Sequence, residues 1–119
     1  MLYNIIYKYK SIIKNFYIKT YHKMEGSHAI IAKIIFIDDS ILYIRDFLFL
    51  NGERKYSYHW QNKNNDLLIR WDNSPHHFHI KTFSHHKHIK DNVVESKEID
   101  VRSILKHINN QINKHKKNE

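Results

Sequence analysis

The sequence contains no cysteine, two glycines and a single proline in 119 residues. Without cysteine, the protein can have no disulfide framework, no thiolate metal site and no cysteine nucleophile. The scarcity of glycine and proline favours regular secondary structure joined by short turns. The absence of disulfide-forming residues fits a reducing compartment.

Long apolar runs are also missing. The first apolar stretch is interrupted by Asn4, Lys8 and Lys10, so it lacks the continuous apolar core of a secretory signal. No other run approaches the length that a membrane-spanning helix requires. We therefore expect a soluble, cytoplasmic protein that has no membrane partner.

Positive charge and histidine are present in excess. The formal net charge is +8, and a charge of this sign suggests a polyanionic partner such as nucleic acid or an acidic protein. AT-rich codon usage could supply many of the lysines, but it does not explain the histidines. The chain has 11 histidines, and six of them lie between His76 and His88.

The length and a hydrophobic content of 41% suit a single domain over residues 1–119. Apolar side chains recur at helical spacing along residues 2–20, with polar side chains opposite them. This pattern predicts an amphipathic N-terminal helix within residues 1–25.

Strand-like runs separated by short turns follow the predicted helix. They predict an antiparallel meander sheet of four or more strands, which together with the histidine-rich segment occupies residues 28–95. Helical spacing returns near the end of the chain and predicts a C-terminal helix over residues 100–115, with Asp100 as its N-cap. The expected fold class is α+β.

The third and fourth predicted strands indicate which face of the sheet carries function. If Trp60 pairs with Leu67 across the intervening loop, the aromatic and aliphatic side chains of both strands share one face. The opposite face then carries Ser57, His59, Arg70 and Asp72. We interpret a face with these polar and ionisable groups as the floor of a functional site.

The histidine-rich segment contains two similar clusters, HHFH and HHKH. His77 and His79 are two residues apart, as are His86 and His88, so each pair projects to one side of an extended chain. If residues 80–84 bend the chain back, both pairs converge beside the predicted site floor.

Such a cluster suits acid–base catalysis without a metal, because histidine titrates near neutral pH. Cleavage of RNA needs a base for the 2′-hydroxyl proton, an acid for the leaving 5′-oxygen and a cation for the charge on phosphorus. The predicted catalytic residues are His59, Arg70, His77, His86, Lys87 and His88. The predicted supporting residues are Asp72, Asn73, His76 and His85. His77 and His86 are the candidates for base and acid, and Arg70 and Lys87 are the candidates for binding phosphate.

Two alternatives remain open. Neutral imidazoles could hold zinc or another divalent ion in a nuclease or phosphotransfer enzyme, although the sequence has no well-specified zinc spacing such as His-Glu-x-x-His. The ligands in that case would be His77, His79, His86 and His88. The other alternative is a non-enzymatic basic protein that binds nucleic acid or another protein through its charge. We therefore predict no cofactor, with a divalent metal as the alternative.

Three motifs in this chain are distinctive: YSYHW at residues 56–60, RWDNSPHH at residues 70–77 and FSHHKH at residues 83–88. Their sequences and order, within roughly residues 29–108, resemble the TumE-like family of toxins from type II toxin–antitoxin modules. The chain departs from the family pattern at Ser84, where proline is common, and at Asp39, where glycine is usual. The resemblance implies a toxin neutralised by a cognate antitoxin that is often DNA-binding. An RNA substrate is our inference from the histidine chemistry, and a homo-oligomer is left open.

Overall fold

The computed structural model describes residues 2–75 and 80–117. In these residues, helix α1 (Leu2–Lys8) precedes a sheet of seven strands, and helix α2 (Val101–Lys117) follows it. The strands are β1 (Ile13–Met24), β2 (Ser27–Phe36), β3 (Ile41–Leu48), β4 (Arg54–Gln61), β5 (Leu67–Asp72), β6 (His86–Ile89) and β7 (Asn92–Glu95). This arrangement confirms the predicted α+β class, with a helix at each end of the described chain.

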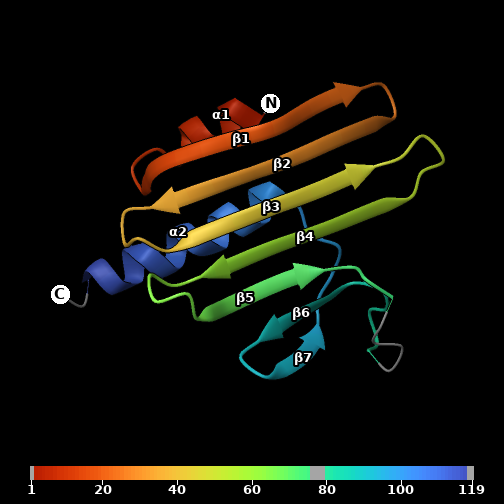
Figure 1. Cartoon of the computed structure of the whole chain (residues 1–119). Coiled ribbons are helices and arrows are strands. Elements are labelled where there is room, and N and C mark those ends of the chain that lie inside the picture. The colour runs from red at the N-terminus through yellow and green to blue at the C-terminus, as the bar shows by residue number, and fades with distance from the viewer. Residues whose placement is uncertain (1, 76–79, 118–119) are drawn as a thin grey trace.

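The seven described strands lie in the sheet in their sequence order, and each pairs antiparallel with the next (Figure 1). The predicted meander is therefore confirmed. The turn after β3 contains Gly52 at φ 90°, a left-handed conformation that glycine adopts without steric cost. Asp39, in the turn between β2 and β3, adopts a φ of 66° at the position where the resemblance leads one to expect glycine.

The N-terminal helix is shorter than the sequence predicts. The prediction of a helix over residues 2–20 is wrong beyond Lys8, because β1 begins at Ile13. The pairing of β1 with β2 shifts register between Ile13 and Asn15 and again between Ile18 and Thr20. The β1 side chains that pack on the core are consequently three, two and three residues apart: Ile13, Phe16, Ile18 and Tyr21. The register shifts in β1 thus give its core-facing side chains a spacing that resembles that of a helix.

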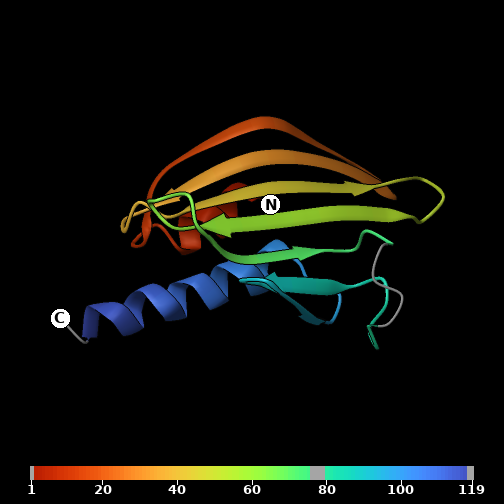
Figure 2. The ribbon, with the colours of Figure 1, turned by 60° about the horizontal axis from the view of Figure 1, so that its bottom comes forward.

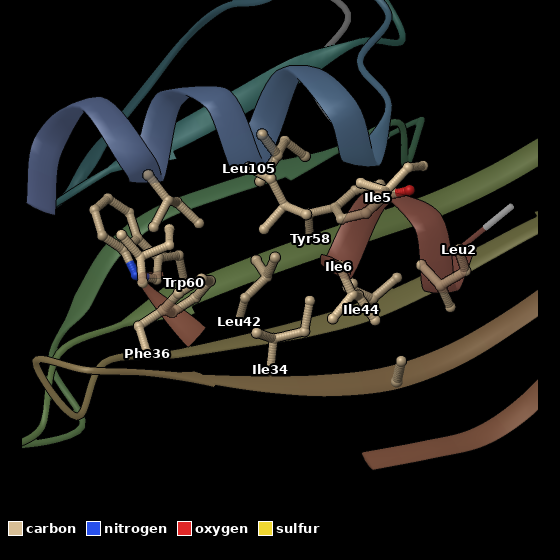
Figure 3. Packing of buried hydrophobic residues seen from close by; sticks show 14 of the residues in the cluster. Leu2, Ile5, Ile6, Ile34, Phe36, Leu42, Ile44, Tyr58, Trp60 and Leu105 are labelled. Atoms are coloured by element: carbon tan, nitrogen blue, oxygen red, sulfur yellow. The ribbon is translucent and has the colours of Figure 1, made fainter. Parts of the chain in front are cut away.

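Both helices cover one face of the sheet, and no helix of the described chain covers the other face (Figures 1 and 2). The core lies between the helices and the sheet (Figure 3). The helices contribute Leu2, Ile5, Ile6, Ile104, Leu105, Ile108 and Ile112 to it. The strands contribute buried side chains that include Ile34, Phe36, Leu42, Ile44, Tyr58, Trp60 and Trp71. Within residues 2–75 and 80–117, neither helix combines the length and apolar character needed to cross a membrane.

The buried Asp46 carboxylate, on the helix-covered face, links the sheet through Arg54 to the residues that precede α2. Asp46 accepts hydrogen bonds from His28 Nε2 at 2.8 Å, from Arg54 Nη2 at 2.7 Å and from the Tyr58 hydroxyl. Burial alone would raise the pKa of Asp46, but these hydrogen bonds and the Arg54 charge lower it below its ordinary value. Arg54 Nη2 also donates to the Ile99 carbonyl at 2.7 Å.

Replacing this carboxylate should destabilise the fold. We expect Asp46→Asn to lower the free energy of unfolding by about 3 kcal/mol at neutral pH, because the largely buried Arg54 guanidinium loses its counter-charge. Since the folded pKa lies below the model-compound value of 3.8, the stabilisation is present above that pH and is lost as the pH falls through the folded pKa. Urea denaturation of both proteins at neutral and acid pH measures this difference.

Asp91→Asn is the matched control, because it removes the same charge at an exposed turn position. We expect it to change the free energy of unfolding by no more than about 0.5 kcal/mol. Equal destabilisation by the two substitutions would contradict the importance of the Asp46 network.

Candidate active site

The polar residues predicted to share one face of β4 and β5 do so. His59 lies opposite Arg70, and Ser57 lies opposite Asp72. The pairing assumed from the sequence is wrong by two residues, since Trp60 pairs with Ile69 and a register irregularity follows at Gln61. A shift of two preserves the face of every side chain, whereas a shift of one would have exchanged the faces. The polar set therefore lies on the open face of the sheet, away from the helices.

Strand β6 adds two histidines to this face. His86 lies opposite Asp72, and His88 lies opposite Arg70. The Asp72 carboxylate is the common partner, with Oδ1 at 2.8 Å from His86 Nε2 and Oδ2 at 3.4 Å from His88 Nε2. Arg70 Nε donates to Asp72 Oδ2 at 3.2 Å. We refer to His59, Arg70, Asp72, His86 and His88 as the Asp72 cluster.

The Asp72 carboxylate is held in its charged form. Burial alone would raise the pKa of Asp72, but the backbone and hydroxyl of Ser74 both donate to Oδ1, at 3.0 and 2.9 Å. These hydrogen bonds, together with the charges of His86 and Arg70, lower the pKa of Asp72 below its ordinary value. The cluster is therefore built around a fixed negative charge.

His86 is enclosed within the protein. Only 1% of its surface is exposed, and its Nδ1 lies 2.9 Å from the Ser84 carbonyl oxygen. Because a carbonyl only accepts, Nδ1 must donate. The other ring nitrogen, Nε2, then faces the Asp72 carboxylate. This geometry orients the carboxylate but keeps the His86 ring away from any molecule bound on the open face.

His59 and Arg70 form the more accessible part of the cluster. Arg70 Nη1 lies 3.3 Å from His59 Nδ1, and His59 Nε2 lies 3.2 Å from Gln61 Oε1. A guanidinium only donates, so Nδ1 is the accepting nitrogen and Nε2 carries the proton. Burial lowers the pKa of His59 and the Arg70 charge lowers it further, against a smaller opposing contribution from Gln61. His59 is therefore a neutral base at neutral pH.

The other predicted site residues lie elsewhere. Lys87 pairs with Trp71 and faces the helix side. Burial lowers the pKa of His107 there, and the charge of Lys87 lowers it further. His85 Nδ1 lies 2.9 Å from the Tyr56 hydroxyl, also on the helix side. Asn73 bonds to the backbone of β4. The predicted residues His76, His77 and His79 lie outside the described residues.

Three residues of the cluster could hold a metal ion. The ligand atoms of Asp72, His86 and His88 all lie within 4.8 Å of one another. One carboxylate and two imidazoles are a ligand set that suits zinc and other divalent transition metals. The sequence indicated the two histidines as ligands but not Asp72. The pairing of β5 with β6 identifies Asp72, because it places this residue opposite His86.

A groove on the open face borders the cluster. Its volume is about 270 Å³, and its lining includes Arg45, Phe47, Lys55 and Arg70. Arg45 and Lys55 were not among the predicted site residues, although both lie on the polar face of strands β3 and β4. Their alternation with the buried residues Ile44, Asp46 and Tyr56 is the signal that could have identified them.

Comparison with known proteins identifies a family for this chain. Residues 2–116 match the family described as Toxin TumE. The comparison with curated proteins found no match, and the comparison with solved structures found none either. The matched segment includes α1, every strand of the described chain and all of α2 except Lys117, and it contains the whole Asp72 cluster.

Proposed function

Since this chain belongs to the TumE toxin family, we propose that it is the toxin of a type II toxin–antitoxin module and acts as a metal-independent ribonuclease. Its partners in this proposal are an RNA substrate and a cognate antitoxin that neutralises it. The observation that carries the proposal is the Asp72 cluster, in which two partly exposed imidazoles flank an arginine on the open face of a basic protein.

Arg70 is the proposed phosphate-binding group. It lies between His59 and His88 in the register of the sheet, and 40% of its side chain is exposed. The backbones of the two histidine strands are two strand spacings apart, roughly 10 Å, which leaves room for a phosphate between imidazoles that reach toward it. A guanidinium in this position stabilises the charge that develops on phosphorus.

His59 is the proposed general base and His88 the proposed general acid. When Arg70 turns to the phosphate and releases Nδ1, neutral His59 removes the proton from the 2′-hydroxyl with that nitrogen, and the 2′-oxygen attacks phosphorus as the bond to the 5′-oxygen breaks. His88, whose Nε2 lies 3.4 Å from Asp72 Oδ2, donates a proton to the leaving 5′-oxygen from its protonated form. The products are a 2′,3′-cyclic phosphate and a free 5′-hydroxyl. His86 is a positioning residue here, because its burial excludes direct contact with the substrate.

Substitution of either accessible histidine should abolish most of the cleavage. We expect His59→Ala and His88→Ala each to lower kcat/KM for a single-stranded oligoribonucleotide by about 10² to 10⁴-fold, the usual contribution of one proton-transfer group. The matched control is His115→Ala, which alters an exposed histidine of α2 and should leave the rate unchanged. Undiminished cleavage by both cluster variants would refute the proposed site.

The pH dependence should report the His59 environment. Because the base acts when neutral and its pKa is lowered, kcat/KM should rise with pH through an inflection below the ordinary pKa of histidine. Arg70→Met removes the charge beside His59, so the inflection should move to higher pH as the overall rate falls. Arg102→Met, on an exposed part of α2, should leave the inflection in place. An inflection that does not respond to Arg70→Met would exclude His59 as the base.

A second candidate function is a metal-dependent nuclease, which is favoured by the mutual proximity of Asp72, His86 and His88. The metal-independent proposal predicts that dialysis against EDTA leaves cleavage unchanged. Loss of cleavage that zinc or manganese restores would support the second candidate instead. Metal analysis of the purified protein, beside a His86→Gln variant, shows whether any bound ion depends on the cluster.

A further inference from the structure

The open face carries a continuous line of side chains that ends at the Asp72 cluster. Successive strand pairings place one residue of each strand opposite the next, from β1 to β6. We call these residues the cross-strand row: Tyr17, Lys33, Tyr43, His59, Arg70 and His88. The first five members each lie between two residues that pack on the core, and His88 lies opposite Arg70, so all six face away from the helices. Figure 2 shows that both helices lie on the other side of the sheet.

Direct contacts link the members of the row. Lys33 Nζ lies 5.8 Å from the ring centroid of Tyr17 and 5.8 Å from that of Tyr43. The Tyr43 ring lies 6.2 Å from the His59 ring, which in turn accepts a hydrogen bond from Arg70. Aromatic and cationic side chains therefore alternate from the edge strand β1 to the candidate catalytic residues.

The aromatic members of the row are available to a ligand. Tyr17 is 55% exposed and Tyr43 is 38% exposed, and neither belongs to the core cluster. Tyr17 comes from the edge strand β1 and Tyr43 from β3, so strand pairing fixes the positions of their backbones. Exposed rings of this kind stack on nucleic-acid bases, while a cation between them pairs with phosphate.

We propose that the cross-strand row binds the single-stranded RNA that flanks the cleaved phosphate. This inference rests on the proposed ribonuclease function, and it adds Tyr17, Lys33 and Tyr43 as binding residues. Arg45 and Lys55, in the adjoining groove, add positive charge to the same face. The charge of the row suits a polyanion, and its rings require unstacked bases. A duplex buries the faces of its bases between neighbouring pairs, so the row selects unpaired RNA.

The test measures binding separately from cleavage. A fluorescein-labelled 2′-O-methyl oligoribonucleotide of about ten residues has no 2′-hydroxyl nucleophile, so it binds without being cut. Fluorescence anisotropy at fixed salt then gives the Kd for the full chain. We expect Tyr17→Ala and Tyr43→Ala each to raise Kd roughly tenfold, as typical losses of base stacking do, and their combination to raise it roughly a hundredfold.

Two further variants separate stacking from general effects on the surface. Tyr43→Phe keeps the ring and should retain a Kd within about threefold of the unmodified protein. Tyr7→Ala removes a ring that is 68% exposed on α1 and should leave Kd unchanged. A duplex of the same sequence should bind at least tenfold more weakly than the single strand. Thermal unfolding confirms that each variant is folded.

The results distinguish the row from the catalytic proposal. Equal affinity of Tyr17→Ala, Tyr43→Ala and the unmodified protein would overturn the row, even if ordinary RNA is cleaved. A loss in Tyr43→Phe as large as that in Tyr43→Ala, or duplex binding as tight as single-strand binding, would also overturn it. Binding that depends on both rings, without cleavage of ordinary RNA, would support the row and overturn the ribonuclease mechanism.

Discussion

The pairing of β5 with β4 on one side and β6 on the other is the constraint on which the candidate site depends. Side chains alternate along a strand, so burial of Trp71 against the helices requires Arg70 and Asp72 to face the opposite way. A slip of one residue would expose the indole and bury a guanidinium, which is unfavourable on both faces. The core thus fixes the register, and the register fixes which ionisable groups meet.

Two buried carboxylates, one on each face, show how the same chemistry serves different purposes. Asp46 is surrounded by donors that belong to the fold, and its Arg54 partner reaches the chain before α2. Asp72 also has a lowered pKa, but two of its neighbours, Arg70 and His88, remain partly exposed. A fixed negative charge with accessible cationic partners can orient groups that act on a ligand. In the Asp46 network, Tyr58 is buried and the Arg54 side chain is 15% exposed, so the accessible partner is His28, on the helix-covered face.

Much of the architecture could be predicted because its signals are local. The alternation in β4 and β5 was sufficient to assign their faces, even though the assumed pairing was wrong by two residues. The extent of α1 could not be predicted, because the two bulges of β1 imitate helical spacing and depend on the partner strand. Strand pairing is a non-local property, and a single sequence contains no direct record of it.

The sequence indicated which residues come together in the candidate site better than it indicated the role of each. The two-residue spacing of His86 and His88 implied a shared face, and the structure places both beside Asp72. The same alternation excludes Lys87 from that face, an inference that required β6 to be recognised as a strand. The burial of His86 could not be foreseen, because it follows from the enclosing Ser84 carbonyl and Asp72 carboxylate.

The edge of the sheet and the cluster depend on each other. Strands β6 and β7 have four residues each, and an isolated hairpin of this size is at best marginally stable in water. It is held to β5 by three registered pairs, two of which join residues of the cluster itself: Arg70 with His88, and Asp72 with His86. The contacts that orient the imidazoles therefore also attach the hairpin to the sheet. It follows that docking of this hairpin completes the cluster, so that a chain in which β6 is detached has lost His86 and His88 from its open face.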